Sequence, residues 1–269
     1  MGDAAAKDGG EPAIAFVGGG AGAALAAIAL LRATTWLRLA YRIVLIDEHG
    51  RFARGRPYGG AGGECLLEIP VKHMSALPDR PCHLMEWARA ERSSPRRTGG
   101  AAAPSPGATA LAPAACGPDT LLSRRVYGDY LADTLAATAA WASPYATLHT
   151  CTDRAVGVGG DDGGAAVQLA SGERIGAAAA VVATGDPAVT APPPVEGAAQ
   201  GAQGASGLSA CSCGALTTPQ GEAARLFAIG SVRRGDSEAT VPRIRDQADA
   251  LAQRLADTVL RTPPGRGQA

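Results

Sequence analysis

The chain has 269 residues and a mass of 26.9 kDa, enough for one large domain or two small ones. Its 25 basic and 25 acidic residues cancel, which removes the electrostatic basis for binding nucleic acid or an acidic membrane surface. We therefore expect neither nucleic acid nor a membrane as partner, and the oligomeric state is left open. The 36 glycines stand against three Trp, five Tyr and three Phe, so the core has to close on small side chains.

The cysteines and the N-terminus bear on location and metal binding. The six cysteines form no CxxC pair and have no histidine at a metal-ligand spacing, so we expect free thiols and no metal site. The first residues, MGDAAAKDGGEP, lack the basic start and apolar core of a secretory signal. The longest apolar run, about residues 21–31, is too short to cross a bilayer. These features predict a soluble cytoplasmic protein.

A strand–helix–strand unit is predicted after a disordered tail over residues 1–12. Residues 13–17 are apolar, like a buried strand, and a glycine-rich turn leads from them into an apolar helix that extends to about residue 39. A second strand, 42–47 (RIVLID), follows and ends on carboxylates. This order builds a parallel sheet, with the helix as the crossover.

Low-complexity and ordered segments alternate in the middle of the chain. Residues 93–118 are rich in Ala, Gly, Pro, Ser and Thr and predict a flexible surface insertion. Helical spacing returns over 119–141, with Asp119 as the expected N-cap. Residues 146–175 alternate and contain two turn signals, which predicts a small β-meander. A buried strand follows at 178–184.

The C-terminal third is predicted as a linker followed by a closing strand and helix. Residues 188–214 are low in complexity and predict no element, whereas 226–229 form an apolar strand. A helix is expected from about Pro242 to Leu260, because proline suits a first helical turn. The expected divisions are 13–92 for the first Rossmann part, 93–118 for the insertion, 119–187 for the helix, meander and strand, 188–214 for the linker and 215–262 for the closing unit.

The glycine turn contains the clearest chemical signal. Gly18, Gly20 and Ala23 fit the pattern GxGxxG/A between a strand and a helix. Gly18 allows the tight turn, Gly20 lets the backbone approach a pyrophosphate, and a small residue 23 lets the helix pack on the strand. Gly19 and Gly22 complete this loop. Since a helix N-terminus offers free N–H groups to phosphate, the pattern predicts a dinucleotide site.

A carboxylate at the end of the second strand supports this prediction. Asp47 can accept hydrogen bonds from the ribose hydroxyls of an adenosine, and Glu48 is the alternative ligand. An acidic residue here disfavours a 2′-phosphate. Asp47 can also be interpreted as a solvated strand-end carboxylate. Taken alone, these features fit a flavoprotein, an NAD-dependent dehydrogenase or an S-adenosylmethionine-dependent methyltransferase.

Six segments in a fixed order favour the flavoprotein. They are VGGGAGA, RFARGRPYG (51–59), CLLEIPVKHMSALPDRP (65–81), SRRVYGDYL (123–131), VVATGDP (181–187) and LFAIGSVRRGDSEATVPRIRDQA (226–248). In this order they resemble FAD/NAD(P)-binding proteins similar to FAD-dependent urate hydroxylase and aspartate N-monooxygenase. The resemblance covers less than half of the residues.

The resemblance implies a Rossmann-like α/β fold with a mainly parallel sheet and an inserted β-meander. It implies FAD in the first site, NAD(P)H as a candidate electron donor, and a monooxygenase-like oxidoreductase acting on an unknown small molecule. The helix that begins near Val241 would point its N-terminus at the flavin ring. Besides the glycine turn and Asp47 or Glu48, the implied cofactor residues are Arg54, Tyr58, Met74, Ser75, Thr184, Gly185 and Gly230.

Two departures from the family pattern keep other interpretations open. Glu68 stands where the related segment has Asn, and the interval 186–225 is short and low in complexity where relatives contain a nicotinamide and substrate region. No second nucleotide-binding unit is visible. The chain can therefore be a non-catalytic FAD-binding or interaction remnant, or a truncated product that folds poorly. The four histidines share no spacing, so no catalytic residue is assigned.

Overall fold

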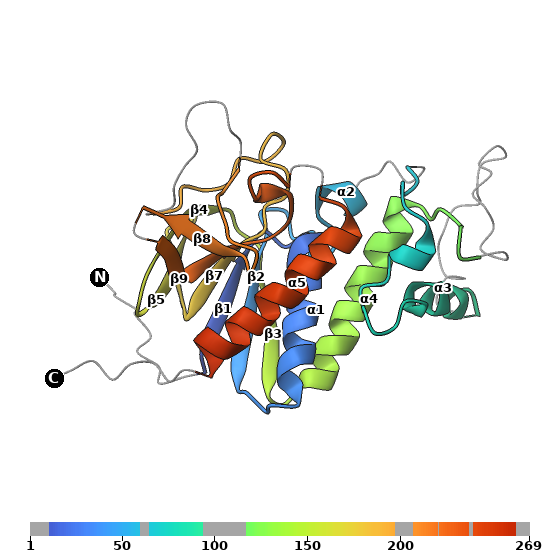
Figure 1. Cartoon of the computed structure of the whole chain (residues 1–269), viewed down its shortest axis with the longest axis horizontal. Coiled ribbons are helices and arrows are strands. Elements are labelled where there is room, and N and C mark those ends of the chain that lie inside the picture. Colours follow the sequence, from blue (N-terminus) through green and yellow to red (C-terminus); the bar gives the residue numbers. More distant parts are fainter. Residues whose placement is uncertain are drawn as a thin grey trace.

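The computed structural model describes residues 11–59, 65–93, 117–196, 207–219, 221–236 and 239–261. The expected N-terminal tail up to residue 10, most of the 93–118 insertion and residues 197–206 of the expected linker lie outside these ranges. Figure 1 shows a central sheet with helices across one face and a small second sheet beside it. This confirms the predicted α/β fold with a mainly parallel sheet and an additional antiparallel sheet.

The central sheet has the strand order β3-β2-β1-β7-β9-β8. All neighbours are parallel except β8, which is antiparallel to β9. The inner strands read as continuous apolar runs because helices and the small sheet cover them on both faces. The bounds are β1 Ala13–Val17, β2 Tyr41–Ile46, β3 Ala146–Cys151, β7 Ala179–Val182, β8 Ala215–Thr218 and β9 Gly221–Ala228.

Helices cover one face of this sheet (Figure 1). The long ones are α1 Ala21–Thr35, α4 Arg124–Ala142 and α5 Val241–Leu255, and α1 packs against both of the others. Helix α5 continues as a π-helical turn over Ala256–Leu260, and its Pro242 lies in the first turn as predicted. The shorter elements are α2 Gly55–Gly59, α3 His83–Ser93 and the 3-10 turns Val71–His73 and Gly230–Val232.

The small sheet covers the opposite face and corrects one prediction. It contains β4 Ala155–Asp161, β5 Gly164–Leu169 and β6 Arg174–Ala177 in an antiparallel meander. Residues 146–151 were expected in the meander, but they form edge strand β3, parallel to β2 with Tyr41 opposite Ala146. Alternation of apolar and polar residues predicts a half-exposed strand, but it does not specify which strand is its partner. Here helix α4, which precedes β3, returns the chain to the central sheet, where β3 pairs in parallel with β2.

Two helix boundaries differ from the prediction. Helix α1 ends at Thr35, earlier than expected, and Arg38 then adopts a left-handed φ of 51°. Helix α4 begins after Ser123, whose hydroxyl accepts a hydrogen bond from the Val126 amide at 3.3 Å. The expected cap, Asp119, instead accepts from Lys72 Nζ at 2.7 Å. Both serine and aspartate are good N-caps, so the local sequence did not separate them.

The described parts of the expected linker are packed against the fold. Val195 forms a bridge with Val158 and Leu208 forms one with Arg233, and both apolar side chains are only 4% exposed. Strand β8 was not predicted. A single valine or leucine among Pro, Ala and Gly has no periodicity, so the burial of such a residue cannot be predicted from local pattern. The expectation of an exposed linker is therefore wrong for these residues.

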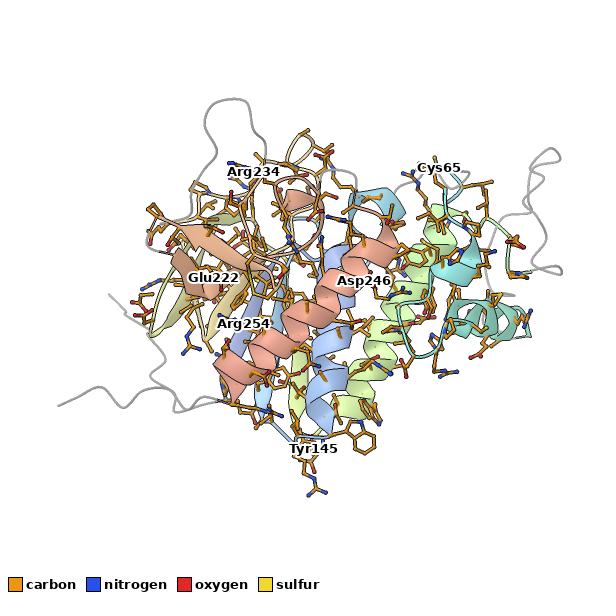
Figure 2. All side chains as sticks on the ribbon, in the orientation of Figure 1. Cys65, Tyr145, Glu222, Arg234, Asp246 and Arg254 are labelled. Atoms are coloured by element: carbon orange, nitrogen blue, oxygen red, sulfur yellow. A yellow bond between two sulfur atoms is a disulfide. The ribbon has the colours of Figure 1, made fainter. Side chains whose placement is uncertain are left out.

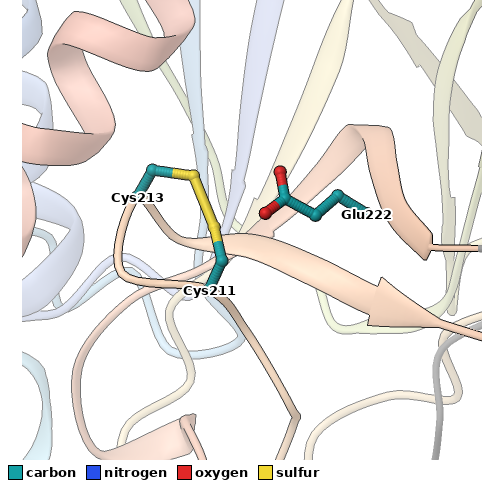
Figure 3. A group of neighbouring side chains, drawn as sticks. All are labelled: Cys211, Cys213 and Glu222. Atoms are coloured by element: carbon teal, nitrogen blue, oxygen red, sulfur yellow. A yellow bond between two sulfur atoms is a disulfide. The ribbon is translucent and has the colours of Figure 1, made fainter.

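The cysteines correct the expectation of free thiols. Cys211 and Cys213 are joined in a disulfide at a tight turn before β8, where the Gly214 amide donates to Cys211 O at 3.0 Å. Figure 3 shows this pair beside Glu222, with the carboxylate and both sulfurs within 4.8 Å of one another. Because these two sulfurs are bonded to each other, the expectation of free thiols is wrong for Cys211 and Cys213. Cys65, Cys82 and Cys151 are free.

Among the described residues, no helix has the length and apolar character needed to cross a membrane.

Candidate dinucleotide-binding site

The carboxyl ends of the parallel strands meet in one row. Val17 of β1 lies opposite Ile46 of β2 and Val182 of β7, and Val182 lies opposite Ala228 of β9. From β1 the chain continues to β2 on one side of the sheet, whereas after β7 it continues to β8 and β9 on the other side. Ligands of open α/β sheets bind at such a reversal, beyond the carboxyl ends of the strands. The loops that leave this row carry Gly18, Asp47, Thr184, Gly185 and Gly230.

Gly18 forms the tight turn that the sequence predicts. Its φ is +105°, and a Cβ built there would lie 2.5 Å from the carbonyl oxygen of Ala183. Its amide donates to Ile46 O at 2.8 Å, so this one residue connects the ends of three strands. Only glycine combines this backbone conformation with this close approach.

Gly20 and the first turn of α1 face the same edge. Gly20 is the N-cap, and within the described residues no side-chain cap hydrogen bond is made at this helix end. The backbone of Gly55 approaches it so closely that a Cβ on Gly55 would lie 3.0 Å from Gly20 Cα. Gly22 faces Ile244 of α5, and Ala23 is fully buried against the sheet. The first turn therefore keeps the uncapped amides that a phosphate can use.

Asp47 lies beside the glycine turn and holds the loop that follows β2. Its Oδ2 accepts from the Gly19 amide at 3.3 Å, and its Oδ1 accepts from the amides of His49 and Arg51 at 3.0 and 2.9 Å. An ionised carboxylate has roughly four acceptor positions. Three backbone bonds therefore leave capacity for one ribose hydroxyl. The alternative, Glu48, is exposed, and its Oε1 lies 3.9 Å from Nε of Arg154 in the turn between β3 and β4.

Arg54 and Tyr58 pack the α2 segment against α4. The guanidinium of Arg54 donates to Asp129 Oδ1 from Nε at 3.1 Å and Nη2 at 2.9 Å. Gly128 allows this contact, since a Cβ there would lie 2.7 Å from Tyr58 O. The Tyr58 ring meets Tyr127 edge-on at 5.3 Å, and burial raises the pKa of the Tyr58 hydroxyl. Arg54 thus anchors the loop next to Gly20.

The Met74 and Ser75 side chains are buried, and the Ser75 hydroxyl makes hydrogen bonds within the protein. Met74 is 2% exposed and Ser75 is fully buried. The Ser75 hydroxyl donates toward the carbonyls of Leu77 and Arg80 at 3.0 and 2.8 Å and accepts from the Leu77 amide at 3.1 Å. Its hydrogen-bonding capacity is therefore spent on the turn that precedes α3.

The loops after β7 and β9 complete the edge. Thr184 follows the residue that touches Gly18, and its buried hydroxyl has no hydrogen-bond partner among the described residues. Gly185 has a φ of +84° and open space around it. Gly230 has a φ of +79°, and its amide donates to Gln247 Oε1 at 2.8 Å.

A buried polar network that the sequence analysis missed holds Gly230 to α5. Asp236 is only 5% exposed and accepts from Gln247 Nε2 at 3.0 Å and Arg243 Nε at 2.6 Å. Arg233 Nε lies 3.5 Å from the same carboxylate. The only signal in the sequence is the charged run RRGDSEATVPRIRDQ, which does not indicate which charges are buried. This network sets the position of the loop rather than contacting the glycine turn.

These features fit the pyrophosphate and adenosine half of FAD. The fit rests on a turn where a Cβ cannot be placed, a helix end with uncapped amides, a carboxylate with spare capacity and an unpartnered buried hydroxyl at Thr184. The amides, the carboxylate and the hydroxyl offer hydrogen bonds of the kind that a dinucleotide needs, and the turn provides the close backbone approach.

Comparison with known proteins assigns the family. A family model described as FAD-NAD(P)-binding matches residues 15–187, more than half of the chain, so the chain belongs to this family. The FAD/NAD(P) cofactor class expected from the sequence is thereby confirmed, and the methyltransferase alternative is set aside. No curated protein matches the chain.

The solved structures that match part of this chain include flavin monooxygenases. A flavin-containing monooxygenase from Stenotrophomonas maltophilia shares 19% identity at a TM-score of 0.40, covering 65% of this chain and 39% of that one. 2-Methyl-3-hydroxypyridine-5-carboxylic acid oxygenase shares 15% at a TM-score of 0.36, covering 65% and 40%. CtdE in complex with FAD shares 11% at a TM-score of 0.39, covering 65% and 39%. This chain thus spans about two fifths of the length of these structures.

Proposed function

We propose that this chain is the FAD-binding part of an NAD(P)H-linked oxidoreductase of the flavin monooxygenase-like class. Its substrate would be a small molecule, and we propose a relationship to FAD-dependent urate hydroxylase and aspartate N-monooxygenase on the strength of the six ordered segments. The observation that carries the proposal is the row of strand ends at which Gly18, Asp47 and Thr184 meet beside the uncapped end of α1. The balanced charge of the chain favours neither nucleic acid nor membrane as partner.

Each part of this edge has a role in the proposed site. The turn at Gly18 and Gly20 and the amides of α1 would hold the pyrophosphate, and Asp47 would bind the ribose. Thr184 would donate its free hydroxyl to the cofactor. The Arg54–Asp129 pair would position the α2 loop against Gly20. When bound, FAD would supply transfer of electrons between the nicotinamide donor and oxygen, which side chains alone cannot perform.

A specific observation favours a second candidate, a non-catalytic FAD-binding remnant. Within the described ranges, the fold contains one strand–helix–strand nucleotide unit, and the small antiparallel sheet β4–β6 takes the place between β3 and β7. A second dinucleotide would need a further parallel unit of about 30 residues. This candidate predicts FAD binding without turnover.

The first experiment is the visible absorbance spectrum of the purified protein, followed by denaturation and chromatography of any released cofactor. A flavin spectrum with released FAD supports the assignment, and NADH and NADPH oxidation then separates the enzyme from the remnant. A folded, colourless protein that also fails to bind added FAD contradicts both.

A matched pair of variants locates the binding site. Gly20→Val adds an isopropyl group at the helix end, where its Cβ would already lie 3.5 Å from Gly55 Cα, so FAD retention should be lost. The control is Gly176→Val, at a strand position with nothing within 4 Å of an added Cβ, and it should retain FAD. Equal FAD content in the two variants would place the cofactor elsewhere.

A further inference from the structure

Two buried hydrogen-bond donors near the site have no acceptor. Tyr127 of α4 is fully buried, and its hydroxyl has no partner in the described part of the chain. Arg245 of α5 has a buried Nε that makes no hydrogen bond to any described residue, and the Oδ1 of its ion-pair partner Asp246 is 4.0 Å from it. Buried donors are seldom left unpaired in native proteins, so each requires an explanation.

The two donors belong to the same interior region. The positive charge of Arg245 acts on Tyr127, where it partly offsets the rise in the Tyr127 pKa caused by burial. Arg245 also donates from Nη1 to the carbonyl of Ser75 at 3.0 Å, which places its guanidinium at the loop between α2 and α3. Neighbouring Tyr130 differs, because its hydroxyl accepts from the Ala76 amide at 2.9 Å.

This region adjoins the glycine turn on two sides. Gly128 follows Tyr127, and a Cβ on Gly128 would lie 3.1 Å from Arg54 Cγ. The residue after Arg54 is Gly55, which touches Gly20. Ile244 precedes Arg245, and its Cγ2 lies 3.9 Å from the Cβ position of Gly22 in the first turn of α1. Each donor residue is therefore the direct neighbour in sequence of a residue that contacts the glycine turn or the loop beside it: Gly128 for Tyr127, and Ile244 for Arg245.

We propose that the Tyr127 hydroxyl and the Arg245 guanidinium form a donor pair for the acceptor edge of the isoalloxazine ring of FAD. This inference rests on the proposed function. The ring carbonyls and nitrogens along that edge accept hydrogen bonds, and a guanidinium suits an edge that becomes more negative when the ring takes up electrons. The pyrophosphate already has donors at the glycine turn and α1. Because burial raises the pKa of the Tyr127 hydroxyl well above its usual range, the hydroxyl keeps its proton at neutral pH.

Tyr127→Phe tests the pair, since it removes one hydroxyl and keeps the ring. The matched control is Tyr145→Phe, labelled in Figure 2, in the turn that follows α4 and so at the opposite end of this helix from Tyr127. The dissociation constants of FAD and of ADP are measured by calorimetry for the wild type and both variants. We expect Tyr127→Phe to weaken FAD about three- to tenfold and to shift the visible flavin bands, while ADP binding and the control stay unchanged.

Other results would overturn the proposal. Unchanged FAD binding by Tyr127→Phe shows that a water molecule or no group meets the hydroxyl, and equal weakening of FAD and ADP moves the contact to the adenosine diphosphate half. If wild-type protein binds ADP but not FAD, or binds neither, the proposed function fails first and separately. If Tyr127→Phe does not fold, Arg245→Gln is titrated in the same way, with the same expected loss for FAD alone.

Discussion

Replacing Gly18 by alanine should destabilise the fold before it affects any ligand. At φ +105°, an L-residue is held in a sparsely populated region, at a cost of about 1–3 kcal/mol. The added Cβ would also lie 2.5 Å from Ala183 O and 2.7 Å from Ala183 C, so backbone rather than a flexible side chain has to move. Overpacking of this kind costs about 1–3 kcal/mol. We expect a loss of roughly 2–6 kcal/mol in the free energy of unfolding.

Two further glycines separate the two causes. Gly185 has a φ of +84° with nothing within 4 Å, so Gly185→Ala should show the conformational cost alone, about 1–2 kcal/mol. Gly176 has open space and no positive φ, so Gly176→Ala should stay within about 0.5 kcal/mol of wild type. Urea unfolding followed by circular dichroism measures all three. If Gly18→Ala has the same free energy of unfolding as Gly176→Ala, then neither the positive φ nor the close approach of Ala183 has the cost assigned to it here.

Three other predictions concern ionisable groups that are buried or partly buried. Asp236→Ala should cost about 3 kcal/mol in urea unfolding, because it leaves the Arg233 guanidinium, 11% exposed, without its carboxylate. Burial and the charge of a nearby arginine lower the pKa of His83. The unfolded chain then binds more protons below about pH 6.5, so the free energy of unfolding should fall as pH decreases through this range and His83→Gln should flatten the profile. Burial raises the pKa of the Cys151 thiol, so peptide mass spectrometry should show slower alkylation there than at exposed Cys82.

Each of these predictions has a control or a contradicting result. Asp246 is 77% exposed on the outer side of α5, as Figure 2 shows, and Asp246→Ala should change stability by less than about 0.5 kcal/mol. An Asp236→Ala variant as stable as Asp246→Ala would contradict the network. A pH profile that keeps its slope in His83→Gln would assign the proton to another group. Equal alkylation rates at Cys151 and Cys82 at neutral pH would contradict the effect of burial on the thiol.

Local patterns predicted the strand–helix–strand start, the glycine turn and the closing helix with Pro242 in its first turn. Each of these depends on the conformational preferences of a few neighbouring residues, such as the freedom of Gly18 at positive φ. The family resemblance extended this to the FAD/NAD(P) class, which the match over residues 15–187 confirms. The particular oxidoreductase remains a proposal.

The partner of β3, the burial of Val195 and Leu208, and the network around Asp236 were decided only in the tertiary structure. In each case the energy comes from a contact between segments far apart in the chain, and the local sequence does not specify which distant segment supplies it. The same reason applies to Tyr127 and Arg245, whose free donors become visible only when α4 and α5 are packed around one loop. The local sequence thus determined most of the long elements, although not β8, while strand register and helix packing decided which side chains meet at the edge of the sheet.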